Sequence, residues 1–483
     1  MRAYVAAMRK KLGISLPRHN FSVASGTPTV LHAMLPNQLV LVLPPSHVVT
    51  VQKALGSGGG AWINKCALKL PRTLPRRFVL AMYVLHERYL GPSRGLMRLW
   101  LESLPPLENA TVFWTDAELE ALEEERAIKR SRSRREELHS EYDSMVRILL
   151  DDGCSSMAED LEDIGVQLER HDYVWATTVV SRHAWHLAPD FPVLVPLSIR
   201  FHLRAAADVA EWGSETEPGA SLYVGSEAAL RPGDELTAFS ETSDNLELLL
   251  DAGYLWHELG SSRVQLRLSA TAAGASLGVV AVGAGAHEGA AEAKRRAWLA
   301  GANWTDRMDF ELSGDGHLNL EMMAWLRLVL ATSAEVASAR SLDDFRAPLS
   351  AATDDRAYNA LLVTLESTLG RYDFSVEEDE ALLRAIAKEG VAARGGAAAR
   401  HALAVSYRLL CKRVLLRTQA LATAQYRQSR RQLSDRPVGE ANEEESEDSP
   451  VSVVVTATGD VIDGQPRKVG KKKRRRRKDR SRK

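Results

Sequence analysis

The sequence has 483 residues, of which 45% are hydrophobic and 26% are charged, as expected for a globular protein that folds in water. This length allows two or three domains, each with an ordinary core. No apolar run reaches the roughly 18 residues of a membrane-spanning helix, so no membrane span is expected. The three cysteines, Cys66, Cys154 and Cys411, form no closely spaced pair, which predicts buried free thiols in a reducing compartment.

The net charge of −1 hides an asymmetry between the body of the chain and its C-terminus. Residues 467–483 hold 13 Lys and Arg residues against one Asp, a surplus of 12 that leaves −13 on the rest of the chain. At the other end, no acidic residue precedes Glu87, whereas basic residues begin at Arg2. That pattern fits either a mitochondrial transit peptide or a basic start to the first domain.

The N-terminal part of the chain predicts mixed α and β structure. Valine and leucine cluster between prolines over residues 29–51, a pattern typical of paired strands, and the glycine-rich residues 55–60 indicate a flexible loop. Apolar residues recur at helical spacing from Arg77 to Leu90. Thr115 and Glu118 have the spacing of a capping box that starts the next helix.

A highly charged stretch follows, from Glu118 to Glu169, and we expect it to form solvent-exposed helices. Residues 173–180 and 193–197 return to a buried, apolar character. After Gly260 the chain becomes rich in alanine and predicts a separate all-α unit. Its helical patterns occupy residues 284–300, 320–332, 355–372, 376–390 and 398–425.

Four motifs in the middle of the chain carry a family resemblance. They are YVWATTVVSR at 173–182, VPL at 195–197, PGDEL at 232–236 and DNLELLLDAGY at 244–254. In this order and spacing they resemble the "RWA…V.SR", "PLxDxxNH", "AGEE" and "SNAELLLxYGF" motifs of the plant Rubisco large-subunit lysine methyltransferase family, which includes the actin-histidine methyltransferases. Weaker matches extend the resemblance to about residues 25–425, at 78–88, 100–105, 113–114, 323–327 and 372–383.

The resemblance implies an α+β fold, in which a SET-type β-fold with a helical insertion is followed by an all-α substrate-binding domain. The expected divisions are an N-terminal extension (1–24), a SET-like domain (25–262) with a charged helical insertion (118–170), a helical domain similar to the Rubisco methyltransferase substrate-binding domain (263–425), and a disordered tail, acidic and then polybasic (426–483).

The family binds S-adenosylmethionine, and three residues match its cofactor positions. Arg182 matches the arginine that contacts the carboxylate region of the cofactor, His202 falls on the asparagine of the "NH" pair, and Asn245 matches the asparagine of "SN". The residues themselves also allow structural interpretations. Arg182 can pair with the acidic body of the protein, and Asn245 can cap the helix that follows it.

The catalytic positions depart from the family pattern. Ser240 falls where the family has its catalytic tyrosine, and a serine hydroxyl is too short to reach the same point, so we expect Ser240 to be non-functional as a catalytic group. Leu203 replaces the histidine of the "NH" pair and has no side-chain donor or acceptor, and Ile199 replaces an acidic residue. The glycine loop of the family is represented only by residues 26–28 or 58–60.

Other candidate sites are weaker. His183 and His186 have helical spacing, but no third ligand accompanies them, so we expect a loop beside the pocket and no metal site. The carboxylates between Glu159 and Asp163 lack apolar surroundings and are interpreted as a solvated face.

The C-terminal tail carries a dense basic run that predicts nuclear localisation, with a mitochondrial address as the alternative, and non-specific RNA or DNA binding. Its members are Lys471, Lys472, Lys473, Arg474, Arg475, Arg476, Arg477 and Lys478. The sequence thus indicates a relative of the SET-domain protein-lysine methyltransferases that uses S-adenosylmethionine and holds a protein substrate or partner in the groove between its domains. The alternative is a catalytically inactive SET-fold scaffold that binds protein or RNA.

Overall fold

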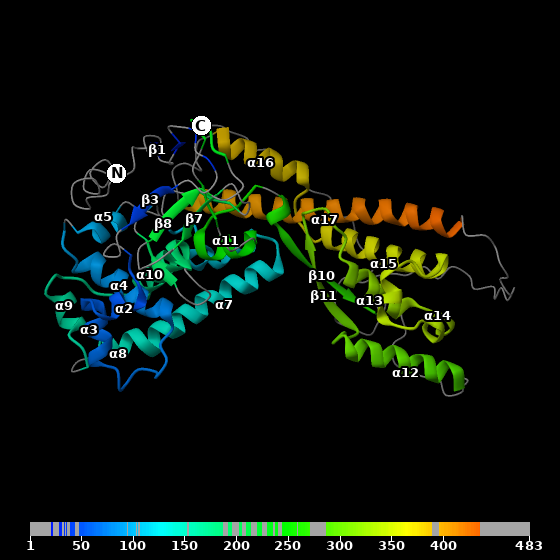
Figure 1. Cartoon of the computed structure of the whole chain (residues 1–483), viewed down its shortest axis with the longest axis horizontal. Coiled ribbons are helices and arrows are strands. Elements are labelled where there is room, and N and C mark those ends of the chain that lie inside the picture. The colour runs from blue at the N-terminus through cyan, green and yellow to red at the C-terminus, as the bar shows by residue number, and fades with distance from the viewer. Residues whose placement is uncertain are drawn as a thin grey trace, which may run out of the picture.

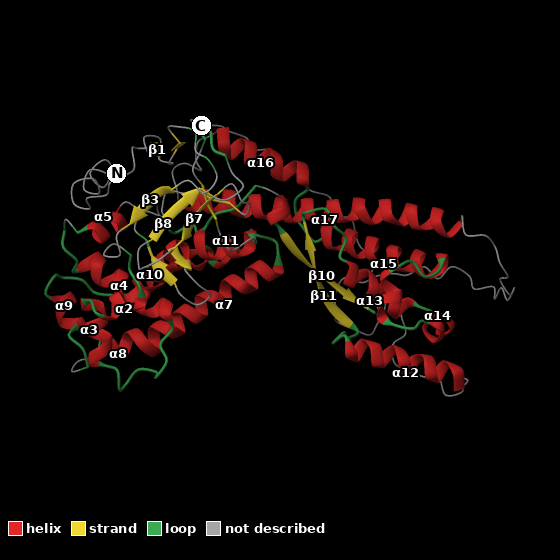
Figure 2. Cartoon of the chain, in the orientation of Figure 1, coloured by secondary structure: helices red, strands yellow, loops and turns green. Residues whose placement is uncertain are grey.

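The computed structural model describes residues 48–186, 192–195, 244–270, 286–388 and 396–434 with a few single positions and pairs left out, and short strands and turns between residues 21 and 43 and between 202 and 239. Two lobes lie side by side in Figure 1, and the long helix α17 (Gly396–Ser434) runs along the second lobe and extends over part of the first. Helices dominate both lobes, while the strands gather in the upper part of the first lobe and at the boundary between the two (Figure 2).

The first lobe is built around two helices, α4 (Arg76–Tyr89) and α10 (Arg170–His183), which pack against each other. Helix α4 buries every residue from Phe78 to Leu85, which confirms the helix predicted there. The ring of Phe78 lies 6.2 Å from that of Tyr173 on α10. The shorter helices around this pair are α2 (Val51–Leu55), α3 (Gly58–Lys65), α5 (Leu96–Glu102), α8 (Arg147–Leu149) and α9 (Met157–Glu162).

The glycine-rich stretch is part of a helix, so the predicted flexible loop is wrong. Gly58, Gly59 and Gly60 form the first turn of α3, and Ser57 caps that turn by accepting a hydrogen bond from the Gly60 amide. A Cβ on Gly59 would lie 2.7 Å from the carbonyl oxygen of Met82, and one on Gly60 would overlap Leu55. Glycine is therefore present because α3 packs closely on its neighbours, a long-range contact that local sequence does not reveal.

The cysteine prediction is also wrong in part. Cys66, at the end of α3, forms a disulfide with Cys154, whereas Cys411 is a buried free thiol as predicted. The two bonded residues are 88 positions apart in the sequence, so their spacing gave no signal of the pairing.

The charged insertion forms helices that are only partly exposed. The capping box at Thr115 and Glu118 starts α6 (Asp116–Glu120), as predicted. The next helix, α7 (Glu125–Glu141), continues into a wider turn, η4 (Tyr142–Val146), and buries Ala127, Ser131 and Leu138 along one side. Its arginines form ion pairs across the lobe, from Arg130 to Glu247 at 2.5 Å and from Arg134 to Asp251 at 3.7 Å.

Five strands form the main sheet of the first lobe, in the order β3 (Leu39–Leu43), β8 (Ala220–Val224), β7 (Val209–Gly213), β9 (Thr237–Phe239) and β6 (His202–Arg204). The expected pairing of strands within residues 29–51 is wrong. Strand β3 pairs with the distant β8, β2 (Thr29–Val30) pairs with β1 (Phe21–Ser22), and residue 51 begins a helix. A pattern of valine and leucine indicates a strand but does not name its partner.

The second lobe contains the predicted helices and an unexpected pair of strands. The helices are α12 (Ala286–Gly301), α13 (Leu320–Leu330), α14 (Ser333–Ser338), α15 (Ala351–Leu369), α16 (Val376–Lys388) and α17, with a short turn η7 (Leu342–Arg346). Strands β10 (Arg263–Ser269) and β11 (Arg307–Ser313) pair antiparallel, so the prediction of an all-α unit is wrong. Val264, Leu266 and Leu268 alternate with less buried residues, the period of two that marks a half-buried strand.

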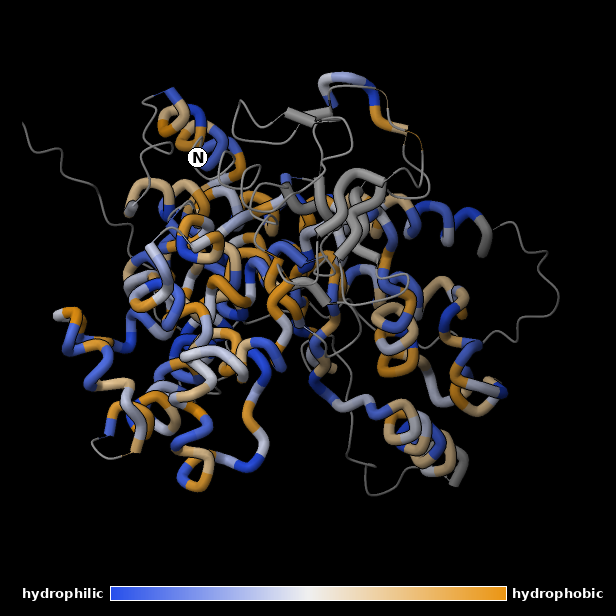
Figure 3. Tube along the Cα trace, turned by 60° about the vertical axis from the view of Figure 1, so that its left-hand side comes forward, coloured by the Kyte–Doolittle hydropathy of each residue, from blue (hydrophilic) through white to orange (hydrophobic). Residues whose placement is uncertain are grey.

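The core of the second lobe extends into the N-terminal part of the chain. Trp114, Leu122 and Leu249 belong to the same buried cluster as Trp325 and Phe345. Hydrophobic and hydrophilic residues alternate along the helices of both lobes (Figure 3), as expected for helices that each bury one face. No helix in the described part of the chain has the length and apolar character needed to cross a membrane.

Candidate functional site

Arg182 lies in the last turn of α10, where the predicted cofactor site begins. Its side chain is half-buried, and burial lowers the pKa of its guanidinium, an effect that the neighbouring Tyr254 partly offsets. An arginine so placed remains charged and favours the carboxyl end of its helix. No carboxylate within the described ranges forms an ion pair with Arg182, so its alternative role as a structural partner of the acidic body is not observed there.

Tyr254, which the sequence did not single out, reaches Arg182 because of how α11 (Asn245–Ala252) ends. Gly253 takes a left-handed conformation with φ of 60° and turns the chain back. A Cβ at this position would overlap the backbone of Asn109 and Ala110, so glycine is required on two grounds. The glycine after an apolar helix was the available signal for this turn.

Asn245 is fully buried and serves the fold. Its side-chain amide nitrogen donates to the Trp256 carbonyl at 2.9 Å and to the Ser262 hydroxyl at 2.8 Å, and its oxygen accepts from the Trp256 amide at 2.7 Å. The helix is capped instead by Asp244, which accepts from the Leu246 amide, so the capping interpretation of Asn245 is wrong. Both donors of Asn245 are engaged within the protein, and its contact with a cofactor stays a prediction.

His202 lies on β6, the strand at the edge of the main sheet, next to β9. Strand β6, which begins at His202, pairs in parallel with β9, so that His202 lies opposite Thr237 and Arg204 opposite Phe239. Ser240 follows β9 directly but lies outside the described residues, as do Ile199, residues 26–28 and the basic run 471–478. The assignments of His202 to the cofactor and of Ser240 to the catalytic position stay predictions.

The histidine pair is separated by a change of secondary structure. His183 is the last residue of α10 and is buried, with its ring 5.7 Å from that of Trp100. His186 ends β4 (Ala184–His186), which pairs with β5 (Pro192–Leu194), so the expected loop is a strand. Among the residues that the structure describes, no group of three His, Cys, Asp or Glu side chains could hold a metal ion.

The carboxylates of α9 are not all solvated. Asp160 accepts hydrogen bonds from the Trp62 indole at 2.8 Å and from the Ser156 hydroxyl at 2.9 Å, so it joins α9 to α3. This corrects the solvated-face interpretation for that residue and assigns it a structural contact.

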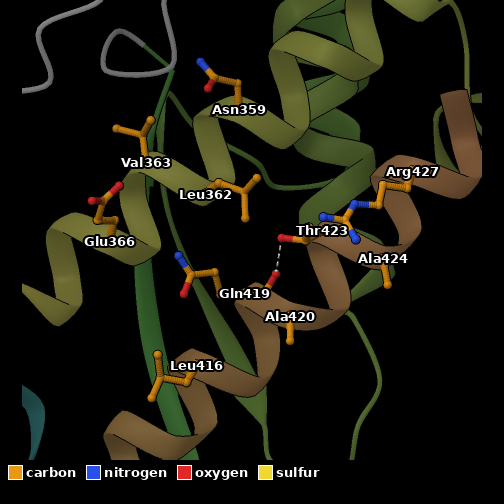
Figure 4. A pocket seen from close by; sticks show the side chains of 10 residues that line it. All are labelled: Asn359, Leu362, Val363, Glu366, Leu416, Gln419, Ala420, Thr423, Ala424 and Arg427. Atoms are coloured by element: carbon orange, nitrogen blue, oxygen red, sulfur yellow. Dashed lines mark hydrogen bonds between the residues drawn. The ribbon is translucent and has the colours of Figure 1, made fainter. Parts of the chain in front are cut away.

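The second lobe carries two hollows on its described surface. The larger, of about 540 Å³, lies between α15 and α17, and the smaller, of about 240 Å³, lies beside Trp304 at the end of α12. Figure 4 shows the larger one with side chains from both helices along its walls. Binding of a partner between the two lobes stays a prediction.

Comparisons with known proteins agree with this architecture. Residues 288–415 match the family model described as Rubisco LSMT substrate-binding. Among solved structures, the SET domain of LSMT bound to lysine and AdoHcy superposes with a TM-score of 0.61 at 16% identity, over 91% of this chain and 97% of that one. Rubisco LSMT bound to AdoMet gives 0.58 over the same shares, also at 16% identity. Rubisco LSMT bound to sinefungin and monomethyllysine gives 0.60, again at 16% identity and over the same shares.

A search of curated proteins finds no match to the sequence. The structural likeness nevertheless spans nearly the whole of the solved LSMT chains, and the family model covers most of the second lobe. The chain therefore has the α+β fold of the Rubisco LSMT type of SET-domain proteins, and its residues 288–415 match the family model of the Rubisco LSMT substrate-binding domain.

Proposed function

We propose that this chain is a SET-type protein-lysine methyltransferase that binds S-adenosylmethionine at the end of α10 and holds a protein segment with its second lobe. The observation that carries the proposal is Arg182, a half-buried guanidinium without a carboxylate partner in the described part of the chain, at the position that the motif at 173–182 assigns to the cofactor. The solved LSMT chains, whose fold it shares, were captured with AdoMet and with lysine.

The residues present fit the carboxylate end of that cofactor. A carboxylate beside Arg182 would form a charge-assisted hydrogen bond, which is stronger than one between neutral groups, and burial reduces its screening by water. Tyr254 adds a phenol next to the guanidinium. Asn245 contributes indirectly, because its hydrogen bonds to Trp256 and Ser262 fix the turn that carries Tyr254.

When bound, the cofactor supplies an activated methyl group, which passes from sulfur to a neutral lysine amine as the S–C bond breaks and the N–C bond forms. The chain must orient the amine and exclude water, since alignment and electrostatics supply the rate of such a transfer. Ser240 cannot align an amine as the tyrosine of the family does. The inactive scaffold, which binds but does not transfer, is therefore the second outcome that an experiment must distinguish.

Titration calorimetry with S-adenosylmethionine on the full chain tests the cofactor part. We expect binding that is weakened at least ~10-fold in Arg182→Gln, the equivalent of ~1.4 kcal/mol. Arg170→Gln is the matched control, because Arg170 lies on the same helix but pairs with Asp143 at the exposed end. Equal affinities in both variants, or no binding at millimolar cofactor, would contradict the proposal.

Methyl transfer is tested separately with a labelled methyl donor and poly-L-lysine. Label on the polymer that depends on Arg182 supports the enzyme. Binding of the cofactor with no label transferred to poly-L-lysine or to the chain's own lysines would instead identify the scaffold.

A further inference from the structure

The disulfide between Cys66 and Cys154 ties the end of α3 to the turn that precedes α9 in the first lobe. Cys66 directly follows α3 and is buried, whereas Cys154 lies between α8 and α9 and is only partly buried. A thiolate from outside attacks a disulfide at a sulfur that it can reach. The partial exposure of Cys154 therefore allows the bond to be attacked while the chain stays folded.

Polar contacts beside the bond join the same two segments independently of it. The Trp62 indole on α3 donates a hydrogen bond to the Asp160 carboxylate on α9 at 2.8 Å. Ser156, the residue before α9, donates to the same carboxylate at 2.9 Å and accepts from the Lys65 ammonium at 3.0 Å. These contacts do not require the S–S bond, so they keep the two thiols close after its reduction and favour its return.

Helix α3 depends on attachment to its neighbours more than an ordinary helix does. Its first turn consists of Gly58, Gly59 and Gly60, and glycine is among the least favourable residues inside a helix. A Cβ on Gly59 or on Gly60 would overlap α4 or α2, so a better helix-forming residue does not fit there. The bond at Cys66 constrains the opposite end of this weak helix.

We propose that the Cys66–Cys154 bond is a reversible redox switch that controls the stability of α3 within an otherwise unchanged fold. On closing, two electrons and two protons pass from the two cysteine thiols to glutathione disulfide. The S–S bond of glutathione disulfide breaks, the Cys66–Cys154 bond forms, and two molecules of glutathione leave. Opening is the reverse reaction with two molecules of glutathione. The switch does not depend on whether the chain transfers a methyl group.

Equilibration of the full chain in buffers of varied glutathione to glutathione disulfide ratio tests the proposal. Acid quenching, denaturation and alkylation with a maleimide then count the free thiols. We expect one free cysteine, Cys411, in oxidising buffers and all three in reducing buffers, with the same circular dichroism in both. Cys66→Ser and Cys154→Ser should each abolish the internal bond, and Cys411→Ser should retain it. Three free thiols at every ratio, or a bond that opens only when the chain is denatured, would overturn the proposal.

Asp160→Ala tests whether the neighbouring contacts hold the thiols together, because it removes the acceptor that Trp62 and Ser156 share. We expect the value of [GSH]²/[GSSG] at half-oxidation to fall ~10-fold, since hydrogen bonds to a carboxylate are lost and the thiols meet less often. Glu159→Ala is the matched control, because Glu159 is an exposed carboxylate on the same helix. A midpoint in Asp160→Ala equal to that of the wild type would contradict the mechanism of closing.

Hydrogen exchange of the oxidised and reduced chains tests which part of the fold the bond controls. Amides of α3 should exchange at least ~10-fold faster after reduction, as expected for a local opening, while those of α4 and α15 keep their rates. Cys66→Ser should reproduce the reduced pattern without any reductant. Unchanged exchange in α3, or faster exchange throughout the first lobe, would show that the bond is not a switch for this helix.

Discussion

His183 is a titratable group placed where protonation is unfavourable. It is buried at the end of α10, with its ring against Trp100 and with Arg182 as its neighbour in the chain. Burial, reinforced by the charge of Arg182, lowers the pKa of His183 well below its ordinary value of 6.5. The unfolded chain therefore binds a proton at mildly acidic pH that the folded chain does not.

This difference predicts that the protein loses stability as the pH falls below about 6.5, by up to ~1.4 kcal/mol per pH unit from this residue alone. His183→Phe retains an aromatic ring and removes the proton site, so urea unfolding at pH 7 and pH 5.5 should show a smaller loss in this variant. His401→Phe, at an exposed position of α17, should retain the loss seen in the wild type. Identical pH dependence in His183→Phe and the wild type would contradict the assignment.

At the scale of secondary-structure elements, glycine has opposite effects in two helices. Gly59 lies in the first turn of α3 against the backbone of Met82 and Tyr83, and its absence of a Cβ permits the contact with α4. Gly289 lies inside α12 with nothing within 4 Å of the place where a Cβ would be. The close packing of α3 therefore needs its glycine, whereas α12 does not.

We accordingly predict that Gly59→Ala lowers the free energy of unfolding by ~1–3 kcal/mol, because the added methyl group meets backbone that cannot move freely. Gly289→Ala should instead raise it by up to ~1 kcal/mol, because alanine favours the helix. Urea denaturation of both variants measures the two changes. If both variants changed the free energy of unfolding by the same amount and in the same direction, α3 would have to adjust to the methyl group.

At the scale of the whole molecule, a buried ionic cluster joins the lobes. Asp379 on α16 accepts hydrogen bonds from Arg408 at 2.6 Å and from Lys412 at 2.6 Å, and all three are almost fully buried. Arg408 also donates to Glu123 in the turn before α7, at 2.5 Å. Glu123 has a left-handed φ of 52°, which costs backbone energy in a non-glycine residue and is held by this contact and by the amide of Asp373.

Removing Asp379 would leave Arg408 and Lys412 with one buried carboxylate fewer. We predict that Asp379→Ala lowers the free energy of unfolding by ~3–5 kcal/mol, since an uncompensated buried charge is costly. Asp343→Ala, which removes a 73% exposed partner of Arg346, should change it by less than ~1 kcal/mol. Hydrogen exchange should locate the loss in α16 and in the turn at 121–123. If α16 and the turn at 121–123 kept their protection from exchange, the assigned role of the cluster would be contradicted.

The proposed role of the basic tail rests on the charge of its sequence alone. We propose that residues 467–483 direct the chain to the nucleus, and that deleting them leaves the protein outside it in a localisation experiment. Any binding of RNA by the tail should fall by orders of magnitude between ~50 and ~200 mM salt. An unchanged distribution after the deletion would favour the acid-free N-terminus as the address.

The sequence by itself determined the features that depend on neighbours within one or two helical turns. Helices α4, α13, α15 and α17 follow their apolar spacing, and the capping box at Thr115 follows from two residues three positions apart. The order of the motifs at 173–254 also indicates the SET-type fold. Short-range hydrogen bonds and periodic burial leave a local record in the chain.

Only the tertiary structure decided which distant residues meet. The pairing of β3 with β8, the disulfide from Cys66 to Cys154 and the approach of Tyr254 to Arg182 each join segments more than 70 residues apart. The sequence offered Asn245 as a cofactor contact or as a helix cap, whereas its buried side chain forms hydrogen bonds that join α11 to the segment 256–262. Such contacts depend on how whole elements pack, and a residue type at one position is compatible with many partners until the chain has folded.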